Sequence, residues 1–280
     1  MSNKIDMSTD GKGESMKKTL FLLPVGILFI IISVIGMVTI NIQNSYTNDY
    51  YQDATSQIII LEKAFMDKSL EDEPAAGLQD NSEADVLPPM SVDPANDGEV
   101  NDGDVNDRDI LAFSSYLYID NTDICYPLVQ GDDNKYYLDH LPNGKKSSSG
   151  SIFIDYQNRL AEDFNVIIYG HNMKDGTMFG QLKNFYGDKK FAQEHDRLVI
   201  FYEGCRYSYE LFSVQRVEYD SEAYEINPAD KALWINNQKL NSVVDSGSDP
   251  NTEDKFVTLS TCGKTDTEKV ITIWKRLSEQ

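Results

Sequence analysis

The chain has 280 residues, enough for one large domain or two small ones, with a formal net charge of −21 and a pI of about 4.4. So acidic a composition argues against a nucleic-acid partner, because phosphate binding needs clustered Lys and Arg. The three cysteines are too few and odd in number for a disulfide framework, so at least one thiol is free unless chains cross-link.

An uncharged apolar run, TLFLLPVGILFIIISVIGMVTI, occupies residues 19–40 after a polar tail over 1–18. Roughly 20 apolar residues cross a hydrocarbon core. A cleaved signal peptide is the alternative, but the run is long and no small-residue cleavage site follows it. Lysines precede the run and acidic residues follow it, so the positive-inside rule places the N-terminus in the cytoplasm and residues 41–280 outside the cell membrane.

The segment after this run has two parts. Residues 49–69 have the composition of a short amphipathic helix, with Ile58, Leu61 and Phe65 on one face. Residues 71–109 contain thirteen Asp and Glu, one Arg and several prolines, which is typical of a solvated linker. A D-x-D-x-N pattern in it lacks the glycine and glutamate of a calcium loop, so we predict no metal site there.

From Ile110 onward, short β-branched and aromatic runs recur between turn residues, which predicts about eight strands. Residues 179–195 and 221–247 break this pattern and are helical in composition. The fold class is therefore mainly β, one barrel or sandwich with helical insertions. The predicted order is a cytoplasmic tail, a transmembrane anchor, a juxtamembrane helix with an acidic linker, and a β domain, over 1–18, 19–40, 41–109 and 110–280.

A thiol and an imidazole both stand where a predicted strand meets a loop. The run VTLSTCGKTD ends in Cys262, and VIIYGHNM ends in His171. A free cysteine is usually a small core residue, and a lone histidine usually serves structure. However, the pair lies at strand ends without the ligand spacing of zinc, which favours nucleophilic catalysis over metal binding. The residues alone leave both interpretations open.

The other candidate residues have less distinctive surroundings. His140 and His195 lie in helix or turn contexts and are predicted to be structural. Cys125 and Cys205 lie within apolar or aromatic runs, so we expect them in the core.

Four segments resemble class B sortases, and the resemblance covers about 110–280. They are TLSTC, YGHNMKDGTMFGQL, YPLVQGDDNKYYLDH and GSIFIDYQN, at 258–262, 169–182, 126–140 and 150–158. The helical insertion over 221–247 is also similar to that class. The resemblance implies a sortase-like eight-stranded β-barrel with helical insertions, preceded by a transmembrane helix and an acidic linker.

The resemblance also implies a function. The chain would be a membrane-anchored cysteine transpeptidase on the outer face of a Gram-positive cell, without a cofactor. Cys262 would attack a C-terminal sorting motif of a secreted protein, of LPxTG or NPxTN type, and His171 would act as general acid and base. The acceptor amine would come from a peptidoglycan precursor or from another surface protein such as a pilin. Ser260 and Thr261 are predicted to bind the substrate.

The family's third residue is an arginine at the start of the last strand, and here that position falls on Lys269. If 263–268 form a hairpin, Arg276 lies about 23 Å further along and on the opposite face. Lys269 is predicted to take the role, with Arg276 as the alternative if the hairpin is longer, and mostly backbone donors for the oxyanion as the third alternative.

Two other functions compete with this one. In a papain-like hydrolase the nucleophile would precede the histidine, whereas here His171 precedes Cys262. A catalytically weak module that only binds sorting peptides is the second alternative, and Lys269 in the arginine position favours it.

Overall fold

A computed structural model of the protein describes residues 11–71, 115–262 and 268–278. The acidic linker predicted over 71–109 lies almost entirely outside the described residues, as does most of the tail predicted over 1–18. The chain forms two compact units, one ending at Asp49 and the other beginning at Tyr50.

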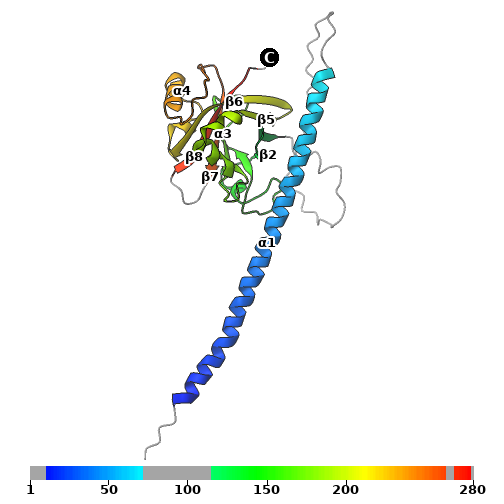
Figure 1. Cartoon of the computed structure of the whole chain (residues 1–280), viewed down its shortest axis with the longest axis vertical. Coiled ribbons are helices and arrows are strands. Elements are labelled where there is room, and N and C mark those ends of the chain that lie inside the picture. The colour runs from blue at the N-terminus through cyan, green and yellow to red at the C-terminus, as the bar shows by residue number, and fades with distance from the viewer. Residues whose placement is uncertain (1–10, 72–114, 263–267, 279–280) are drawn as a thin grey trace, which may run out of the picture. The chain divides into compact units, whose positions relative to one another are not determined.

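Eight strands form a closed barrel in the order β1-β2-β3-β4-β7-β8-β6-β5 (Figure 1). The pairs β2–β3 and β4–β7 are parallel, and the other neighbouring pairs are antiparallel. The strand bounds are β1 Tyr116–Ile119, β2 Cys125–Gln130, β3 Ile152–Ile154, β4 Asn165–His171, β5 Arg197–Tyr202, β6 Cys205–Glu218, β7 Phe256–Cys262 and β8 Glu268–Arg276. The predicted mainly-β barrel is confirmed.

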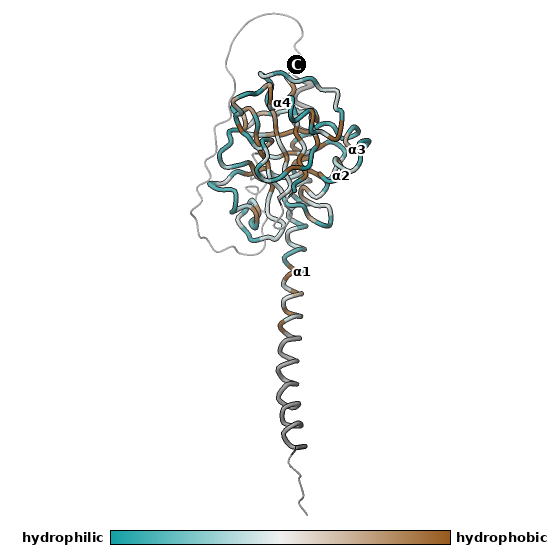
Figure 2. Tube along the Cα trace, turned by 90° about the vertical axis from the view of Figure 1, so that its left-hand side faces the viewer, coloured by the Kyte–Doolittle hydropathy of each residue, from teal (hydrophilic) through white to brown (hydrophobic). Residues whose placement is uncertain are grey.

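Successive residues of a strand point to opposite faces of the sheet. The apolar side chains of the strands therefore form two hydrophobic clusters, one on each face. Val257, Leu259 and Trp274 belong to the larger cluster, with residues of most other strands. Phe256 and Ile273, at the intervening positions, belong to a second cluster together with residues of the β6–β7 connection. Hydrophobic segments gather in the interior of the β domain and hydrophilic ones at its periphery (Figure 2).

Short helices fill the connections between strands. They are η1 Tyr136–Leu138, η2 Phe179–Gln181, α2 Leu182–Gly187, α3 Lys189–Glu194, η3 Glu222–Tyr224 and α4 Lys231–Leu240. Asp188 caps α3 by accepting from the amides of Lys190 and Phe191, and Asp230 caps α4 by accepting from the amide of Leu233. The helical stretches predicted over 179–195 and 221–247 are confirmed, although in the second only η3 and α4 are helical.

The helix α1, Gly11–Glu71, continues into the second unit and packs there against the barrel. Ala54 and Ile58 are almost fully buried. Of the predicted apolar face, Ile58 is buried and Leu61 is 38% exposed, while the Phe65 side chain lies outside the described residues. The buried face instead follows Tyr51, Ala54 and Ile58, because the intervals of three and four residues place them along one side of the helix.

The carboxylate of Glu62 joins the packed segment of α1 to β1 and β6. Glu62 accepts from the hydroxyls of Tyr116 and Tyr118 at 3.0 and 3.2 Å, and Arg206 approaches it at 3.4 Å. Among the residues whose side chains the structure describes, no helix is both long and apolar enough to cross a bilayer.

Candidate active site

The parallel ladder between β4 and β7 brings the two predicted catalytic positions together. The register runs in step from Asn165 opposite Phe256 to His171 opposite Cys262. Because parallel strands run in the same direction, their carboxyl ends meet at one edge of the sheet. Two strand ends that lie 91 positions apart in the sequence therefore become neighbours, and directly paired positions share a face of the sheet.

Polar contacts at the other end of the ladder fix this register. The side-chain amide of Asn165 donates to the carbonyls of Ala223 and Glu225, and its oxygen accepts from the Thr258 hydroxyl at 2.8 Å. Asn165 and Thr258 are fully buried. A slip of one residue would leave these buried groups unpaired, and it would also move the cysteine position to the opposite face of the sheet.

The imidazole of His171 has one defined hydrogen-bond partner, because its Nε2 lies 2.6 Å from the carbonyl oxygen of Leu138. A carbonyl oxygen only accepts, so Nε2 carries the hydrogen in this contact. In the neutral ring, Nδ1 then holds the lone pair and is the nitrogen that can exchange a proton with a substrate. The ring is half-buried, at a strand end that opens to a loop.

A glycine beside the histidine permits the close packing of β4 at this point. A Cβ at Gly170 would lie 2.4 Å from the Ile152 side chain and 2.7 Å from the ring of Phe179. Any larger residue would push β4 away from these two neighbours. Gly170 therefore contributes to the placement of His171 without any chemistry of its own.

The antiparallel pairing of β7 with β8 places Lys269 near the cysteine. The register runs from Phe256 opposite Lys275 to Ser260 opposite Ile271. Two further steps of the same register bring position 262 opposite position 269. Lys269 is half-buried and also pairs with Val217 of β6. The start of the return strand is therefore where the sequence predicted it, while the role of Lys269 stays a prediction.

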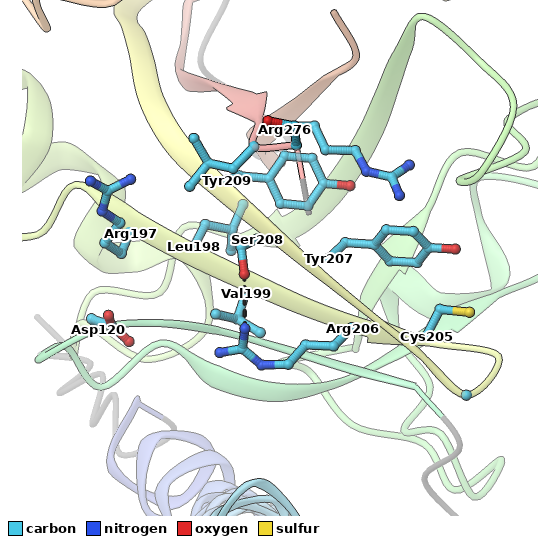
Figure 3. Close-up of a pocket in the computed structure, with 13 residues that line it drawn as sticks. Asp120, Arg197, Leu198, Val199, Cys205, Arg206, Tyr207, Ser208, Tyr209 and Arg276 are labelled. Carbon is cyan, nitrogen blue, oxygen red and sulfur yellow. Dashed lines mark hydrogen bonds between the residues drawn. The ribbon is translucent and has the colours of Figure 1, made fainter. Parts of the chain in front are cut away.

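Arg276 lies at the opposite end of β8. Its guanidinium carbon is 4.1 Å from the centre of the Tyr207 ring. Figure 3 shows the side chain beside Tyr207 and Tyr209, in a cavity of about 860 Å³ that is also lined by Arg197 and Arg206. Seven residues at ~3.3 Å each separate Arg276 from Lys269, which is beyond the reach of an arginine side chain.

The β6–β7 connection is attached to the same strands. The Tyr224 hydroxyl of η3 and the Ser260 hydroxyl are 2.8 Å apart. The Thr261 hydroxyl donates to the carbonyl of Val270 at 3.3 Å. Both predicted substrate-binding residues are buried, at 2% and 5% exposure, and have partners within the protein. Their substrate-binding role stays a prediction, and the structure adds Tyr224 as a neighbour that no sequence pattern indicated.

The remaining histidines have structural surroundings, as predicted. The ring of His140 stacks on Tyr136 with centroids 4.1 Å apart, and its Nδ1 is 2.9 Å from the Tyr136 carbonyl. The ring of His195 stacks on Phe191 at 4.0 Å, and its Nδ1 is 2.7 Å from the Phe191 carbonyl. In both, the ring packs against its own helical turn.

The prediction that Cys125 and Cys205 are core residues needs correction. Cys205 is exposed, because it follows the tight β5–β6 turn in which Glu203 and Gly204 have positive φ angles of 51° and 80°. Such a turn projects from the barrel edge. Cys125 is only partly buried at the start of β2, where burial raises the pKa of its thiol to about 11 although a contact with Thr55 opposes the shift.

Comparison with known proteins gives a consistent set of relatives. Residues 117–276 match the family described as the sortase domain. Sortase B of Listeria monocytogenes serovar 1/2a is 39% identical over 158 residues, covering 55% of this chain and 63% of that protein. Sortase B of Staphylococcus aureus is 30% identical over 152 residues, covering 52% and 62%. The matched part thus spans less than two thirds of the length of these curated relatives.

Solved structures extend the same likeness to three dimensions. A mutant form of Clostridium perfringens sortase B superposes with a TM-score of 0.55 and 32% identity, covering 60% of this chain and 82% of that one. Sortase B from B. anthracis in complex with AAEK1 gives a TM-score of 0.55 and 31% identity, with coverage of 60% and 80%.

Proposed function

The chain belongs to the sortase family, in class B, and on that premise we propose that it is a cysteine transpeptidase with Cys262 as nucleophile and His171 as general acid and base. The observation that carries the proposal is the direct pairing of these two positions at the carboxyl ends of β4 and β7. A thiol at one strand end and an imidazole at the next is the arrangement that nucleophilic catalysis needs.

The proposed reaction has two balanced halves. The thiolate of Cys262 attacks the Thr carbonyl carbon of a sorting motif, and a carbon–sulfur bond forms. The tetrahedral intermediate collapses with cleavage of the peptide carbon–nitrogen bond, and protonated His171 gives its proton to the leaving amine. An acceptor amine then attacks the thioacyl carbon, neutral His171 takes its proton, and the thiolate leaves.

Lys269 is the proposed cation of the site. The register of β7 and β8 supports this position opposite the cysteine. A positive side chain there would stabilise the oxyanion of the tetrahedral intermediate. It would also lower the pKa of the Cys262 thiol and so favour the thiolate.

The substrate would be a secreted protein with a C-terminal motif of LPxTG or NPxTN type, and the acceptor a peptidoglycan precursor or a pilin amine. A membrane anchor over 19–40 would hold the enzyme near both. Supporting the anchor, Ile32, Ile35, Met37 and Ile40 of α1 are each more than half exposed, although they are apolar. Large exposed apolar surfaces mark interaction with a membrane or another protein.

Peptide-library cleavage by the purified full chain tests the proposal, with and without an added amine such as triglycine. We expect cleavage of one motif type between its Thr and the next residue, and a new peptide product when the amine is present. Cleavage that is unselective between library members, or that never transfers the acyl group to an amine, would contradict a transpeptidase.

A binding module is the second candidate, because lysine at position 269 lacks the planar bidentate fork of arginine. Such a module would hold a sorting peptide without cutting it. Saturable peptide binding by the wild-type chain with no thioacyl adduct after prolonged incubation would favour this candidate over the enzyme.

A further inference from the structure

The part of α1 that packs on the barrel, called the stem below, contacts the loop before β3. That loop in turn packs on Leu138, whose carbonyl binds His171. The Tyr51 hydroxyl donates to the carbonyl of Gly150 at 2.5 Å. Tyr51 is 8% exposed, and burial raises the pKa of its phenol, so the group stays a donor throughout the physiological range. This contact joins residues 99 positions apart in the sequence.

The peptide group that accepts from Tyr51 continues the chain of hydrogen bonds. Its N–H, that of Ser151, donates to the carbonyl of Tyr137 at 2.9 Å, and the Ser151 hydroxyl donates to the carbonyl of His140 at 2.7 Å. Leu138 lies between Tyr137 and His140 in the sequence, and its carbonyl accepts the hydrogen bond from Nε2 of His171. The Leu138 carbonyl belongs to the peptide group that directly follows the one bonded by the Ser151 N–H, so the two groups are joined covalently within η1.

Packing makes this connection rigid. Gly150 has a φ of +56°, and a Cβ there would lie 2.5 Å from the Tyr137 oxygen and 2.6 Å from the Leu138 oxygen. The backbone of Gly150 therefore rests directly on the peptide group that binds the histidine. A shift of Gly150 cannot be absorbed by empty space and must move the Leu138 carbonyl.

The ring of Tyr51 reaches the histidine loop by a second route. It packs edge-to-face on Tyr126 with ring centroids 5.3 Å apart, and the Tyr126 hydroxyl accepts from the backbone N–H of Met178 at 2.8 Å. Met178 pairs with Asn172, the residue after His171. Both routes begin at one side chain of α1 and end beside the same imidazole.

We propose that Tyr51 is a positioning residue, through which the docked stem helix sets the orientation of the His171 imidazole. The inference rests on the proposed function only for its effect on catalysis. The geometric part, that α1 controls the Leu138–His171 hydrogen bond, holds whether or not the chain is a transpeptidase.

A matched pair of variants in the full-length chain separates positioning from simple anchoring. Tyr51→Phe removes the hydroxyl and keeps the ring on Tyr126. Thr55→Val removes a hydroxyl one turn later on the same helix, which donates to the carbonyl of Cys125 at 3.0 Å and lies outside the route through Gly150. Each variant loses one helix-to-barrel hydrogen bond, so we expect similar, small losses of thermal stability.

The first readout does not depend on activity. With ¹⁵N-labelled histidine, the chain gives only three imidazole groups, and His171→Ala assigns the relevant one. We expect Tyr51→Phe to shift the Nε2 resonance of His171, while Thr55→Val leaves it in place. An unchanged His171 resonance in Tyr51→Phe, or an equal shift in Thr55→Val, would overturn the proposal even if the wild-type chain cleaves no peptide.

The second readout is kcat/KM with a sorting peptide. Loss of one positioning hydrogen bond predicts a roughly three- to tenfold decrease for Tyr51→Phe, against less than about twofold for Thr55→Val. Equal values for the two variants would overturn the catalytic part. If Tyr51→Phe does not fold, Ser151→Ala removes the hydrogen bond from this segment to the carbonyl of His140, close to Leu138 in the chain. An unshifted His171 resonance in that variant contradicts the proposal.

Discussion

Two places on this barrel combine a cysteine at a strand end with a cation on β8. Only one of them also has a histidine in position to act as a base. At the end of β7, position 262 pairs with His171 and lies near Lys269 in the strand register. At the start of β6, Cys205 is exposed and shares a cavity with Arg276, and the described residues lining that cavity include no histidine. A thiol and a cation are thus common to both, and the base distinguishes them.

The strand pairing explains the difference. β4 and β7 are parallel, so their carboxyl ends lie at the same edge of the sheet and positions 171 and 262 are directly paired in the register. β5 and β6 form a tight antiparallel hairpin, where Cys205 pairs with Tyr202, its near neighbour in sequence. A parallel pair brings together groups that are distant in the chain, whereas a hairpin offers only what the local sequence supplies.

The largest contrast concerns the two thiols. Cys262→Ala should decrease cleavage by roughly 10³-fold or more, because the acyl-accepting atom is lost. Cys205→Ala should leave kcat/KM within about twofold, since the proposed reaction does not use it. Steady-state kinetics with one sorting peptide checks both, and near-wild-type turnover in Cys262→Ala would remove the proposed function.

The base should come next in size. His171→Ala should decrease turnover by about 10²- to 10⁴-fold, which is the usual contribution of a positioned general acid and base. His195→Ala is the matched control, because that ring stacks on Phe191 within its own helix. If the control proved the more damaging change, the acid–base residue would have been placed at the wrong strand end.

Substitution of the two cations, Lys269 and Arg276, should give a smaller difference in turnover between the two places. Lys269→Ala should depress turnover by more than about tenfold through loss of an oxyanion donor, and Lys269→Arg should retain or raise it. Arg276→Ala should change turnover little, because that side chain lies over Tyr207 at the far end of β8. An inactive Arg276→Ala beside an unaffected Lys269→Ala would reverse the assignment.

Removing the part of α1 that packs on the barrel should lower the stability of the barrel as well as the turnover. Both a fragment from residue 41 and one from residue 110 should cleave peptide, but the second loses the buried contacts of Tyr51, Ala54 and Ile58. Burial of side chains of this size is worth several kcal/mol, so its Tm should be lower by about 5 °C or more. Equal melting temperatures in calorimetry would show that the helix contributes nothing to the barrel.

The smallest effect concerns the thiol of Cys125, which belongs to neither of the two places compared above. Burial raises the pKa of Cys125 to about 11, so at pH 8 this group is a thiol and should resist iodoacetamide, while exposed Cys205 reacts. Peptide mapping after a short alkylation measures both. Faster labelling of Cys125 than of Cys205 would contradict the burial at the start of β2.

Residue patterns predicted much of this fold because its elements are locally marked. The strand runs, the helical insertions and the two strand-end residues carry periodicity and turn residues that act over a few positions. Cys205 was misplaced because an aromatic run describes composition, and only the positive φ angles of Glu203 and Gly204 show that the run begins at a projecting turn. Helical spacing grouped Leu61 with Ile58 but did not say that the buried side of the helix follows Tyr51, Ala54 and Ile58.

The groups that position the site were beyond sequence reasoning for another reason. The Leu138 carbonyl belongs to the backbone, and any residue type could supply it. Tyr51 and Tyr224 are single tyrosines among sixteen, and they gain importance only from contacts across 99 and 36 positions. Long-range contacts of this kind leave no mark on the local pattern.

The most direct test of the central claim is intact-mass measurement of the chain after acid quenching with a sorting peptide. Our account predicts a thioacyl adduct equal in mass to the amino-terminal part of the peptide, present in the wild-type chain and in Cys205→Ala and absent in Cys262→Ala. An adduct that persists in Cys262→Ala, or that maps to Cys205, would contradict the assignment of the nucleophile to the end of β7.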